Sequence, residues 1–403
     1  MVGPLNNTSE GRPLVRLMAG RHKRVRTGHP WVYSNEIAMD AAAKKLAPGA
    51  LVRLEAGNGE PLGVAMFNPR TLIAARMLDR DPSASIDAGF LARKLAAALA
   101  VRERLYPGGY YRLVHAEADG FPGLIVDRYG DLCVVQANTA GFDRLMPELL
   151  EALDVTVKPA SVVLRNDSGS RQLEGLADEV RLVKGTLDGL TEVFEYGAPY
   201  LADLREGQKT GWFYDQRDNR ALVARLAAGA RVLDAYAYIG GFGISCARAG
   251  ARDIVILDRS ALALDLAAQS AKRNNVEAVC NFTRAEVFPE LERLGAAGER
   301  FDIVVVDPPA FVKSRKDLQA GVRGYRKLAR LAAPLVTPGG FLFIASCSHN
   351  VDRPTFDEQI AHGLSDAMRT GRILYSGGAG LDHPVHPSLP ESAYLKASLL
   401  QLD

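Results

Sequence analysis

The sequence Arg231-Val-Leu-Asp-Ala-Tyr-Ala-Tyr-Ile-Gly-Gly-Phe-Gly243 is the strongest indication of fold in this chain. It is typical of a strand over residues 231–235 that passes through a glycine turn into a helix over residues 242–249. Glycine lets a backbone approach a ligand closely, and the first turn of a helix offers N–H groups that have no partner within the helix. The spacing differs from the G-x-G-x-x-G of dinucleotide sites, so a ligand with a pyrophosphate is disfavoured.

Four more apolar runs follow this stretch and alternate with helical patterns. The runs lie at residues 253–257, 278–282, 301–306 and 340–346, and the helical patterns lie at residues 261–274, 318–335 and 355–369. Continuous apolar strands separated by helices indicate a parallel sheet that is covered on both faces. We therefore predict an α/β, Rossmann-like domain from residue 191 to the end.

The first half of the chain has a different organisation. Residues 12–79 show short strands between turn signals, with runs at 50–55 and 62–67, which indicates a small β-rich module. Residues 80–190 combine a helical pattern at 90–106 with a hairpin pattern at 123–136, which predicts a compact α/β domain.

Length and composition place the chain among multidomain globular proteins. Its 403 residues exceed one ordinary domain, and 47% of them are hydrophobic. The sequence shows neither a membrane-spanning run nor a secretory signal at its start. Its four cysteines are scattered without metal-ligand spacing, so we expect a cytoplasmic protein without a metal. Three of them lie inside apolar periodic segments and are expected to be buried: Cys133, Cys246 and Cys280.

Charge is distributed unevenly along the chain. The net charge is +2, but residues 1–80 hold twelve Lys and Arg against six Asp and Glu, an excess of +6. A second basic run follows residue 309. Two such runs favour a polyanionic partner such as a nucleic acid over the alternative of a solvated surface.

Acidic residues mark the strands of the predicted Rossmann-like domain. Asp234 lies in the first strand, and Asp258 ends the second, where its carboxylate can accept hydrogen bonds from ribose hydroxyls; ordinary helix capping is the alternative. Glu286 follows the third strand, where a carboxylate can meet an adenine amino group. Asp307 ends the fourth strand, and Pro308-Pro309 hold it at the sheet edge where such folds bind ligands.

The fifth strand ends in Ser346-Cys-Ser-His349. Because neighbouring parallel strands end at the same edge, we expect Cys347 to lie near Asp307. C5 of cytosine is a poor nucleophile, but a thiolate that adds to C6 turns C5 into an enamine-like carbon that can accept a methyl group. A carboxyl group near N3 assists that addition. Cys347 and Asp307 suit these two roles, and a base must then remove the C5 proton.

These segments together resemble one family, the bacterial large-subunit ribosomal RNA cytosine-C5 methyltransferases with an N-terminal PUA domain. The resemblance covers nearly the whole chain. It is carried by residues 24–36 (RVRTGHPWVYSNE), 115–128 (HAEADGFPGLIVDR), 207–220 (GQKTGWFYDQRDNR), 236–242, 307–313 (DPPAFVK), 323–325, 345–348, 382–384 and 394–396.

The resemblance implies a three-part architecture and a reaction. The parts are a PUA-like RNA-binding domain at residues 12–79, an α/β middle domain at 80–190 and a class I methyltransferase domain at 191–403 with a mostly parallel, seven-stranded sheet. The implied cofactor is S-adenosylmethionine, the implied partner is 23S ribosomal RNA, and the implied product is 5-methylcytosine. Homodimers occur among such proteins, so the oligomeric state stays open.

The resemblance also assigns roles to single residues. Cys347 matches the position of the family's nucleophile, with Asp307 beside it. The candidate cofactor contacts are Lys209, Tyr214, Gln216, Arg217, Asp234, Tyr236, Gly240, Gly241, Asp258, Glu286 and Asp307. The candidate RNA contacts are Arg21, Lys23, Arg24, Arg26, Lys313, Arg315, Lys316 and Arg323.

Three departures from the family's pattern leave alternatives open. Ile239 stands where many members have Thr or Ala, and Glu286 where Asp is usual. A neighbouring family has a second Cys directly after Asp-Pro-Pro, where this chain has Ala310, so Ser348 and His349 both remain open as the base that serves product release.

Two other functions compete with the cytosine-C5 reaction. The first is methyl transfer to an exocyclic amino group such as N2 of guanine, which usually places an aromatic residue where Ala310 stands. The second is a non-catalytic RNA-binding or ribosome-assembly factor, which would have no need of the cofactor segments.

Overall fold

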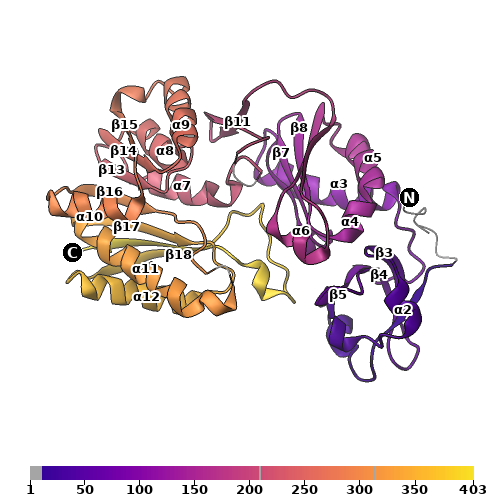
Figure 1. The fold of residues 1–403 in the computed structure, drawn as a ribbon. Helices are drawn as coiled ribbons and strands as arrows, with labels where there is room; N and C mark the ends of the chain where they lie inside the picture. The colour runs from indigo at the N-terminus through magenta and orange to yellow at the C-terminus, as the bar shows by residue number, and fades with distance from the viewer. Residues whose placement is uncertain (1–10, 208–209, 313) are drawn as a thin grey trace. The chain divides into compact units, whose positions relative to one another are not determined.

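The computed structural model describes residues 11–207, 210–312 and 314–403 (Figure 1). Contacts divide the chain into two compact units. Unit 1 comprises the described residues up to Gly189, with Asp203–Trp212 and Leu381–Ser392; unit 2 comprises Leu190–Ala202, Phe213–Gly380 and Ala393–Asp403. Among the described residues, no helix is both long and apolar enough to span a membrane.

The first sheet of unit 1 has five strands in the order β1-β3-β4-β5-β2. The strands are β1 (Leu14–Arg16), β2 (Trp31–Tyr33), β3 (Ala50–Glu55), β4 (Pro61–Phe67) and β5 (Ile73–Asp79), with the short helices α1 (Lys23–Arg26) and α2 (Ala41–Lys45). Their apolar side chains form one core that includes Val32, Leu54 and Phe67. The predicted β-rich module is confirmed, and the runs at 50–55 and 62–67 match β3 and β4 within one residue.

The second sheet of unit 1 has the order β10-β9-β8-β7-β6. Its strands are β6 (Tyr110–His115), β7 (Leu124–Tyr129), β8 (Leu132–Ala137), β9 (Ser161–Asn166) and β10 (Glu179–Lys184). The helices are α3 (Ala88–Leu105), α4 (Ala140–Arg144), α5 (Met146–Thr156) and α6 (Gly169–Glu174). The helical stretch from Ala140 to Thr156 is broken at Leu145, which ends α4 and precedes α5. Pro147 explains the break, because proline starts a helix well but cannot continue one.

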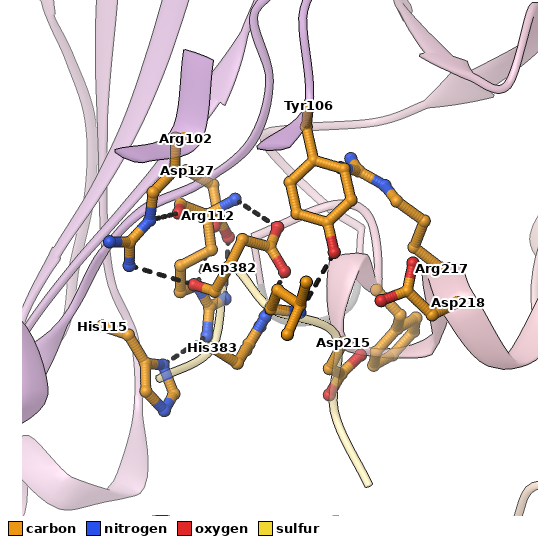
Figure 2. A network of polar contacts seen from close by, with 12 residues as sticks. Arg102, Tyr106, Arg112, His115, Asp127, Asp215, Arg217, Asp218, Asp382 and His383 are labelled. Carbon is orange, nitrogen blue, oxygen red and sulfur yellow. Dashed lines mark hydrogen bonds and ion pairs between the residues drawn. The ribbon is translucent and has the colours of Figure 1, made fainter. Parts of the chain in front are cut away.

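A buried polar network joins distant segments of unit 1 (Figure 2). Asp127 accepts two hydrogen bonds from the Arg112 guanidinium, both 2.8 Å long. Asp382 accepts one from the Arg112 backbone N–H at 3.0 Å, and its carbonyl oxygen accepts one from Arg102 at 3.1 Å. Arg102 also forms a two-pronged ion pair with Asp119. We call these five residues the tail network.

Three segments that carry the resemblance meet in and around the tail network. Two segments that the sequence places in the last domain, 203–212 and 381–392, pack with unit 1. Asp382 is one anchor, and Asp127 supplies another by accepting a hydrogen bond from the Thr210 hydroxyl at 2.5 Å. The Tyr129 hydroxyl donates to the Thr210 carbonyl at 3.0 Å. Motifs 115–128, 207–220 and 382–384 are therefore partly structural.

Unit 2 contains a seven-stranded sheet in the order β15-β14-β13-β16-β17-β19-β18. The strands are β13 (Arg231–Ala235), β14 (Asp253–Asp258), β15 (Cys280–Arg284), β16 (Phe301–Val306), β17 (Val336–Ser346), β18 (Gly371–Gly377) and β19 (Lys396–Leu402). The first five run parallel, and β19 is antiparallel to both of its neighbours. The predicted mostly parallel, seven-stranded sheet is confirmed.

Helices and one hairpin complete unit 2. They are α7 (Arg217–Ala224), α8 (Gly241–Arg248), α9 (Ala261–Arg273), α10 (Val287–Ala296), α11 (Leu318–Ala332), α12 (Arg353–Asp366) and the hairpin β11 (Thr191–Glu195) with β12 (Ala198–Ala202). Sequence reasoning misses α10, whose Pro289 and Gly295 are weak helix formers. It also misses β18, an edge strand whose side chains are exposed or half-buried and therefore lack an apolar run.

Candidate functional site

The turn after β13 holds a strained backbone. Tyr236, Tyr238 and Gly240 all have positive φ angles, of +62°, +51° and +76°. Two bulky residues in the left-handed region are unusual, and such conformations concentrate at ligand-binding sites. The turn lies at the carboxyl edge of the sheet, where the fold binds ligands.

Glycines let α8 begin close to this sheet edge. A Cβ atom on Gly243 would lie 2.9 Å from Ile256 Cγ1 and 3.2 Å from Asp234 Oδ2, and one on Gly240 would lie 3.1 Å from Ala267 Cβ. Gly241 is buried at the first position of α8. The predicted strand, glycine turn and helix are therefore all present, and the N-terminus of α8 lies beside the strained turn.

Asp234 is hydrogen-bonded to the first turn of α8, directly after the glycine turn. It is 1% exposed, and its Oδ2 accepts a hydrogen bond from Gly243 N–H at 2.7 Å. Burial raises the pKa of Asp234 to about 7, and the nearby carboxylates Asp307 and Asp258 act in the same direction. Its main contact is with the turn itself, so we infer that it shapes the cofactor site.

Asp258 and Glu286 stand at the ends of the next two strands. Asp258 closes β14 and accepts hydrogen bonds from Tyr238 N–H at 2.8 Å and from Ser260 N–H at 2.9 Å. Glu286 is exposed at the N-cap position of α10. Burial and then the Glu286 charge raise the pKa of Tyr236, which places these two residues near each other. The carboxylates and the glycine turn offer the donor and acceptor set that the ribose and adenine of S-adenosylmethionine require.

The segment that begins at Tyr214 is buried. Tyr214, Gln216 and Arg217 are 1–3% exposed, and the Arg217 guanidinium lies 5.0 Å from the centre of the Tyr214 ring. Glu195 on β11 accepts two 2.6 Å hydrogen bonds from Arg220 and lies 3.7 Å from Arg217. Sequence reasoning misses this pair because the hairpin of β11 and β12 carries no motif. Lys209 lies outside the described residues.

The predicted nucleophile and Asp307 lie on adjacent strands. β16 and β17 pair in parallel, with Val306 opposite Ile344, so both loops leave the same edge. Cys347 Sγ lies 3.9 Å from the carbonyl oxygen of Pro308. Asp307 is half-buried, and its N–H donates to the Ala235 carbonyl at 3.4 Å. The prediction that the two loops meet is confirmed.

Exposure separates Cys347 from the other cysteines. All four cysteines lie in the described part of the chain; Cys347 is half-exposed, and the other three are buried. Burial raises the pKa of Cys133 and Cys280 to about 12, and that of Cys246 above its usual range. A thiol must ionise and reach solvent to act as a nucleophile, so Cys347 is the suitable one.

Buried hydroxyls fix the residues on both sides of Cys347. The Tyr325 hydroxyl of α11 is 2.8 Å from the hydroxyls of both Ser346 and Ser348. Ser348 Oγ also accepts a hydrogen bond from Val312 N–H at 3.1 Å, which ties the loop to the segment after Asp307. The Ser348 hydroxyl is therefore buried and engaged, whereas His349 is exposed.

The candidate RNA contacts of unit 1 differ in availability. Arg24 is held by Glu36 at 2.8 Å and stacks on the Tyr33 ring at 4.7 Å. Arg26 pairs with Glu60 at 2.9 Å. Arg21 and Lys23 are exposed and form no ion pair with a described side chain. Of the four, Arg21 and Lys23 are the best placed to meet a phosphate.

In unit 2, Lys316 and Arg323 are exposed. Lys313 lies outside the described residues, as does the side chain of Arg315. In the described part of the chain, no group of three or more His, Cys, Asp or Glu side chains is suited to a metal ion.

Two family models match separate parts of the chain. A PUA-like domain model matches residues 15–80, and a model described as S-adenosylmethionine-dependent methyltransferase matches residues 145–374.

Curated relatives match nearly the whole chain. The protein named ribosomal RNA large subunit methyltransferase I from Cronobacter sakazakii is 35% identical over 94% of this chain and 97% of its own. A protein of the same name from Shewanella denitrificans is 36% identical over 95% of this chain and 97% of its own.

Solved structures share the fold. A candidate SAM-dependent methyltransferase from Streptococcus mutans has a TM-score of 0.81 at 20% identity and covers 96% of this chain and 100% of its own. A candidate methyltransferase complexed with SAH gives the same TM-score and identity over 96% of this chain and 99% of its own.

Proposed function

Because the chain belongs to the S-adenosylmethionine-dependent methyltransferase family that includes the ribosomal RNA large subunit methyltransferases I, we propose that it methylates C5 of a cytosine in 23S ribosomal RNA through Cys347. The assignment of Cys347 as the nucleophile rests on its position in the fold. Cys347 is half-exposed, and its Sγ lies 3.9 Å from the carbonyl oxygen of Pro308. It directly follows β17, at the same edge of the sheet as the strained glycine turn.

S-adenosylmethionine supplies an electrophilic methyl group when bound. Asp258 would hold its ribose and Glu286 its adenine, while the turn at Tyr236–Gly240 gives the backbone a close approach. Asp234 keeps that turn in place through Gly243. Tyr214, Gln216 and Arg217 are proposed to line the same site.

Cys347 begins the reaction as a thiolate. Its sulfur adds to C6 of the cytosine, a C–S bond forms, and the electron pair of the C5–C6 double bond becomes available at C5. The Asp307 carboxyl group, at the end of the adjacent strand, would donate a hydrogen bond to N3 in its protonated form as negative charge develops on the ring. C5 would then bond to the methyl carbon while the bond between that carbon and the sulfonium sulfur breaks, which would leave S-adenosylhomocysteine.

Product release reverses the first step. A base removes the C5 proton, the C5–C6 double bond forms again, and the C–S bond breaks to return the thiolate. We propose His349 for this proton transfer, because it ends the loop Ser346–His349 (the cysteine loop), two residues after Cys347, and is exposed.

The partner is ribosomal RNA, and unit 1 supplies its docking surface through the PUA-like domain. Arg21, Lys23, Lys316 and Arg323 are proposed as phosphate contacts, which give affinity and register. An enzyme of ribosomal RNA works where ribosomes are made, so we propose a cytoplasmic location. We also propose the three-part division at residues 12–79, 80–190 and 191–403, in which segments 203–212 and 381–392 of the last part pack with unit 1.

Product analysis tests this function. Ribosomal RNA methylated with labelled S-adenosylmethionine should yield labelled 5-methylcytosine after digestion to nucleosides, and the Cys347→Ser variant should yield none. Labelled N2-methylguanine would instead support the exocyclic-amino alternative. Absence of any label with the wild-type protein would support a non-catalytic factor.

A further inference from the structure

A buried lysine contacts the loop of the proposed nucleophile. Lys396 is 5% exposed and begins β19, directly opposite Ser346 in the antiparallel register with β17. Its Nζ donates hydrogen bonds to the carbonyl oxygens of Ser348 at 2.6 Å and Tyr394 at 2.8 Å. The ammonium therefore holds the backbone immediately after Cys347.

A buried ammonium needs compensation by negative charge or oriented dipoles. Burial lowers the pKa of Lys396 to about 8, while Cys347 and Asp352 raise it and Arg353 lowers it. Asp352 caps α12 by accepting from Thr355 N–H, and Arg353 is bound to Asp357. Cys347 is the largest attractive charge that Lys396 meets.

We propose that Lys396 is a positioning residue of the methyl transfer, whose ammonium fixes the cysteine loop and stabilises Cys347 as a thiolate. The proposal rests on the proposed function, in which Cys347 is the nucleophile. Coupling between two charges is reciprocal, so a thiolate that stabilises the ammonium is stabilised by it to the same extent. Cationic neighbours promote thiolate formation in other reactive cysteines.

The proton and charge of this step balance without a further reactant. The Cys347 thiol loses its proton to solvent, and Lys396 keeps its own proton throughout. When sulfur bonds to C6, the negative charge passes to the cytosine ring, and the methyl group, which comes from a sulfonium, neutralises it. Loss of the C5 proton then supplies the electron pair that expels Cys347 as a thiolate. Lys396 faces the charged form of Cys347 before and after each turnover.

Tyr325 offers a matched control. Its hydroxyl holds the same loop through Ser346 and Ser348, but it is neutral in the working pH range because burial raises its pKa. A purely structural role for Lys396 would make the Lys396 and Tyr325 variants behave alike. An electrostatic role would separate them by their pH dependence.

The test is the pH profile of Cys347 alkylation by iodoacetamide, followed by mass spectrometry of its peptide, in full-length protein without RNA. Lys396→Met keeps the volume without the charge, and Lys396→Gln keeps hydrogen-bond donors without the charge. We expect the pH midpoint of Cys347 alkylation to rise by about one pH unit in both Lys396 variants. In Tyr325→Phe we expect the midpoint to stay at the wild-type value. Unchanged midpoints in folded Lys396 variants would overturn the proposal.

A second measurement covers the case in which both Lys396 variants fail to fold. The ¹³Cε resonance of Lys396 reports its titration in wild-type protein and in Cys347→Ser. We expect the midpoint to fall in Cys347→Ser, because the thiolate is gone; an equal midpoint contradicts the coupling. Neither experiment needs methyl transfer, so a failure of the nucleophile assignment would appear separately, as a missing adduct with substrate.

Discussion

The tail network of unit 1 and the cysteine loop of unit 2, Ser346–His349, are both held by buried polar groups. In the tail network, Arg102, Asp127 and Asp382 are at most 2% exposed. Arg102 is paired with Asp119, and Asp127 is paired with Arg112. In the cysteine loop, Ser346 and Ser348 are just as buried, but the residue between them is half-exposed. A network in which every charged group has a buried partner stabilises the fold. A loop that is fixed by buried hydroxyls but leaves one sulfur accessible can also react with a substrate.

The largest effect should come from removing that reactive atom. Cys347→Ser is expected to lower methyl transfer by roughly 10³-fold or more, because serine is a far weaker nucleophile at neutral pH. The free energy of unfolding should change by less than about 0.5 kcal/mol. Cys246→Ser, at a buried cysteine, should show the opposite pattern: lower stability and normal turnover. Equal activity of Cys347→Ser and wild type would abolish the contrast between the two regions.

The next effect should come from opening the tail network. Asp127→Ala leaves the Arg112 guanidinium without its two-pronged partner, which is expected to cost about 3–5 kcal/mol of unfolding free energy in chemical denaturation. The double variant Asp127→Leu with Arg112→Met should lose less, because it leaves no unpaired charge. A loss below about 1 kcal/mol for Asp127→Ala would mean that the network contributes little to stability.

Asp258 has both a structural and a binding role. Asp258→Ala removes the acceptor for Tyr238 N–H and the proposed ribose contact, so S-adenosylmethionine should bind ~10–100-fold more weakly, as for loss of a charged hydrogen bond. Isothermal titration calorimetry measures this. Glu286→Gln is the milder companion, with an expected loss below about tenfold because Glu286 is exposed. Unchanged affinity in Asp258→Ala would remove it from the cofactor site.

A pH-dependent stability should follow from Asp234. Burial raises its pKa to about 7, so the folded protein keeps a proton that the unfolded chain loses near pH 4. The unfolding free energy without cofactor should therefore fall as pH rises from about 4 to about 7, by at most ~1.4 kcal/mol per pH unit. Asp234→Asn should flatten this fall, and an identical pH dependence of stability would contradict it.

The smallest effect should come from the exposed basic residues of unit 1. Arg21→Ala with Lys23→Ala should weaken RNA binding and lower its salt slope by roughly 1–2, at ~0.7–0.9 per phosphate contact. Arg24→Ala is the control, because Arg24 is held by Glu36 and should affect the stability of the first sheet instead. If the salt slope of RNA binding changed in Arg24→Ala and not in the Arg21→Ala, Lys23→Ala variant, Arg24 would be the phosphate contact instead.

Sequence reasoning predicts the strands of unit 2 well because they are continuous Val, Ile and Leu runs. β13 and β16 match the predicted ranges. The strand predicted over 278–282 is present as β15 but begins two residues later, at Cys280, because a helical turn at Glu277–Val279 precedes it. Edge strand β18 and the two segments that pack with unit 1 have no local pattern, since long-range contacts define them.

The candidate site divides in the same way. Asp307 and Cys347 follow apolar strands, so their approach can be inferred from the order of parallel strands alone. Lys396 and Tyr325 lie within motifs of the resemblance but carry no pattern that indicates their contact with the cysteine loop. Glu195 precedes the segment that begins at Tyr214 and lies in a separate hairpin. Its ion pair with Arg220 can therefore be recognised only in the folded chain.

The most direct test of the central claim is a covalent trap. RNA that carries 5-fluorocytosine at the target cannot lose fluorine as a proton, so with S-adenosylmethionine the sulfur adduct should accumulate. We expect a complex that resists denaturation and whose cross-linked peptide contains Cys347, and we expect none with Cys347→Ser. An adduct formed equally well by Cys347→Ser, or no adduct despite methyl transfer to unmodified RNA, would contradict covalent catalysis through Cys347.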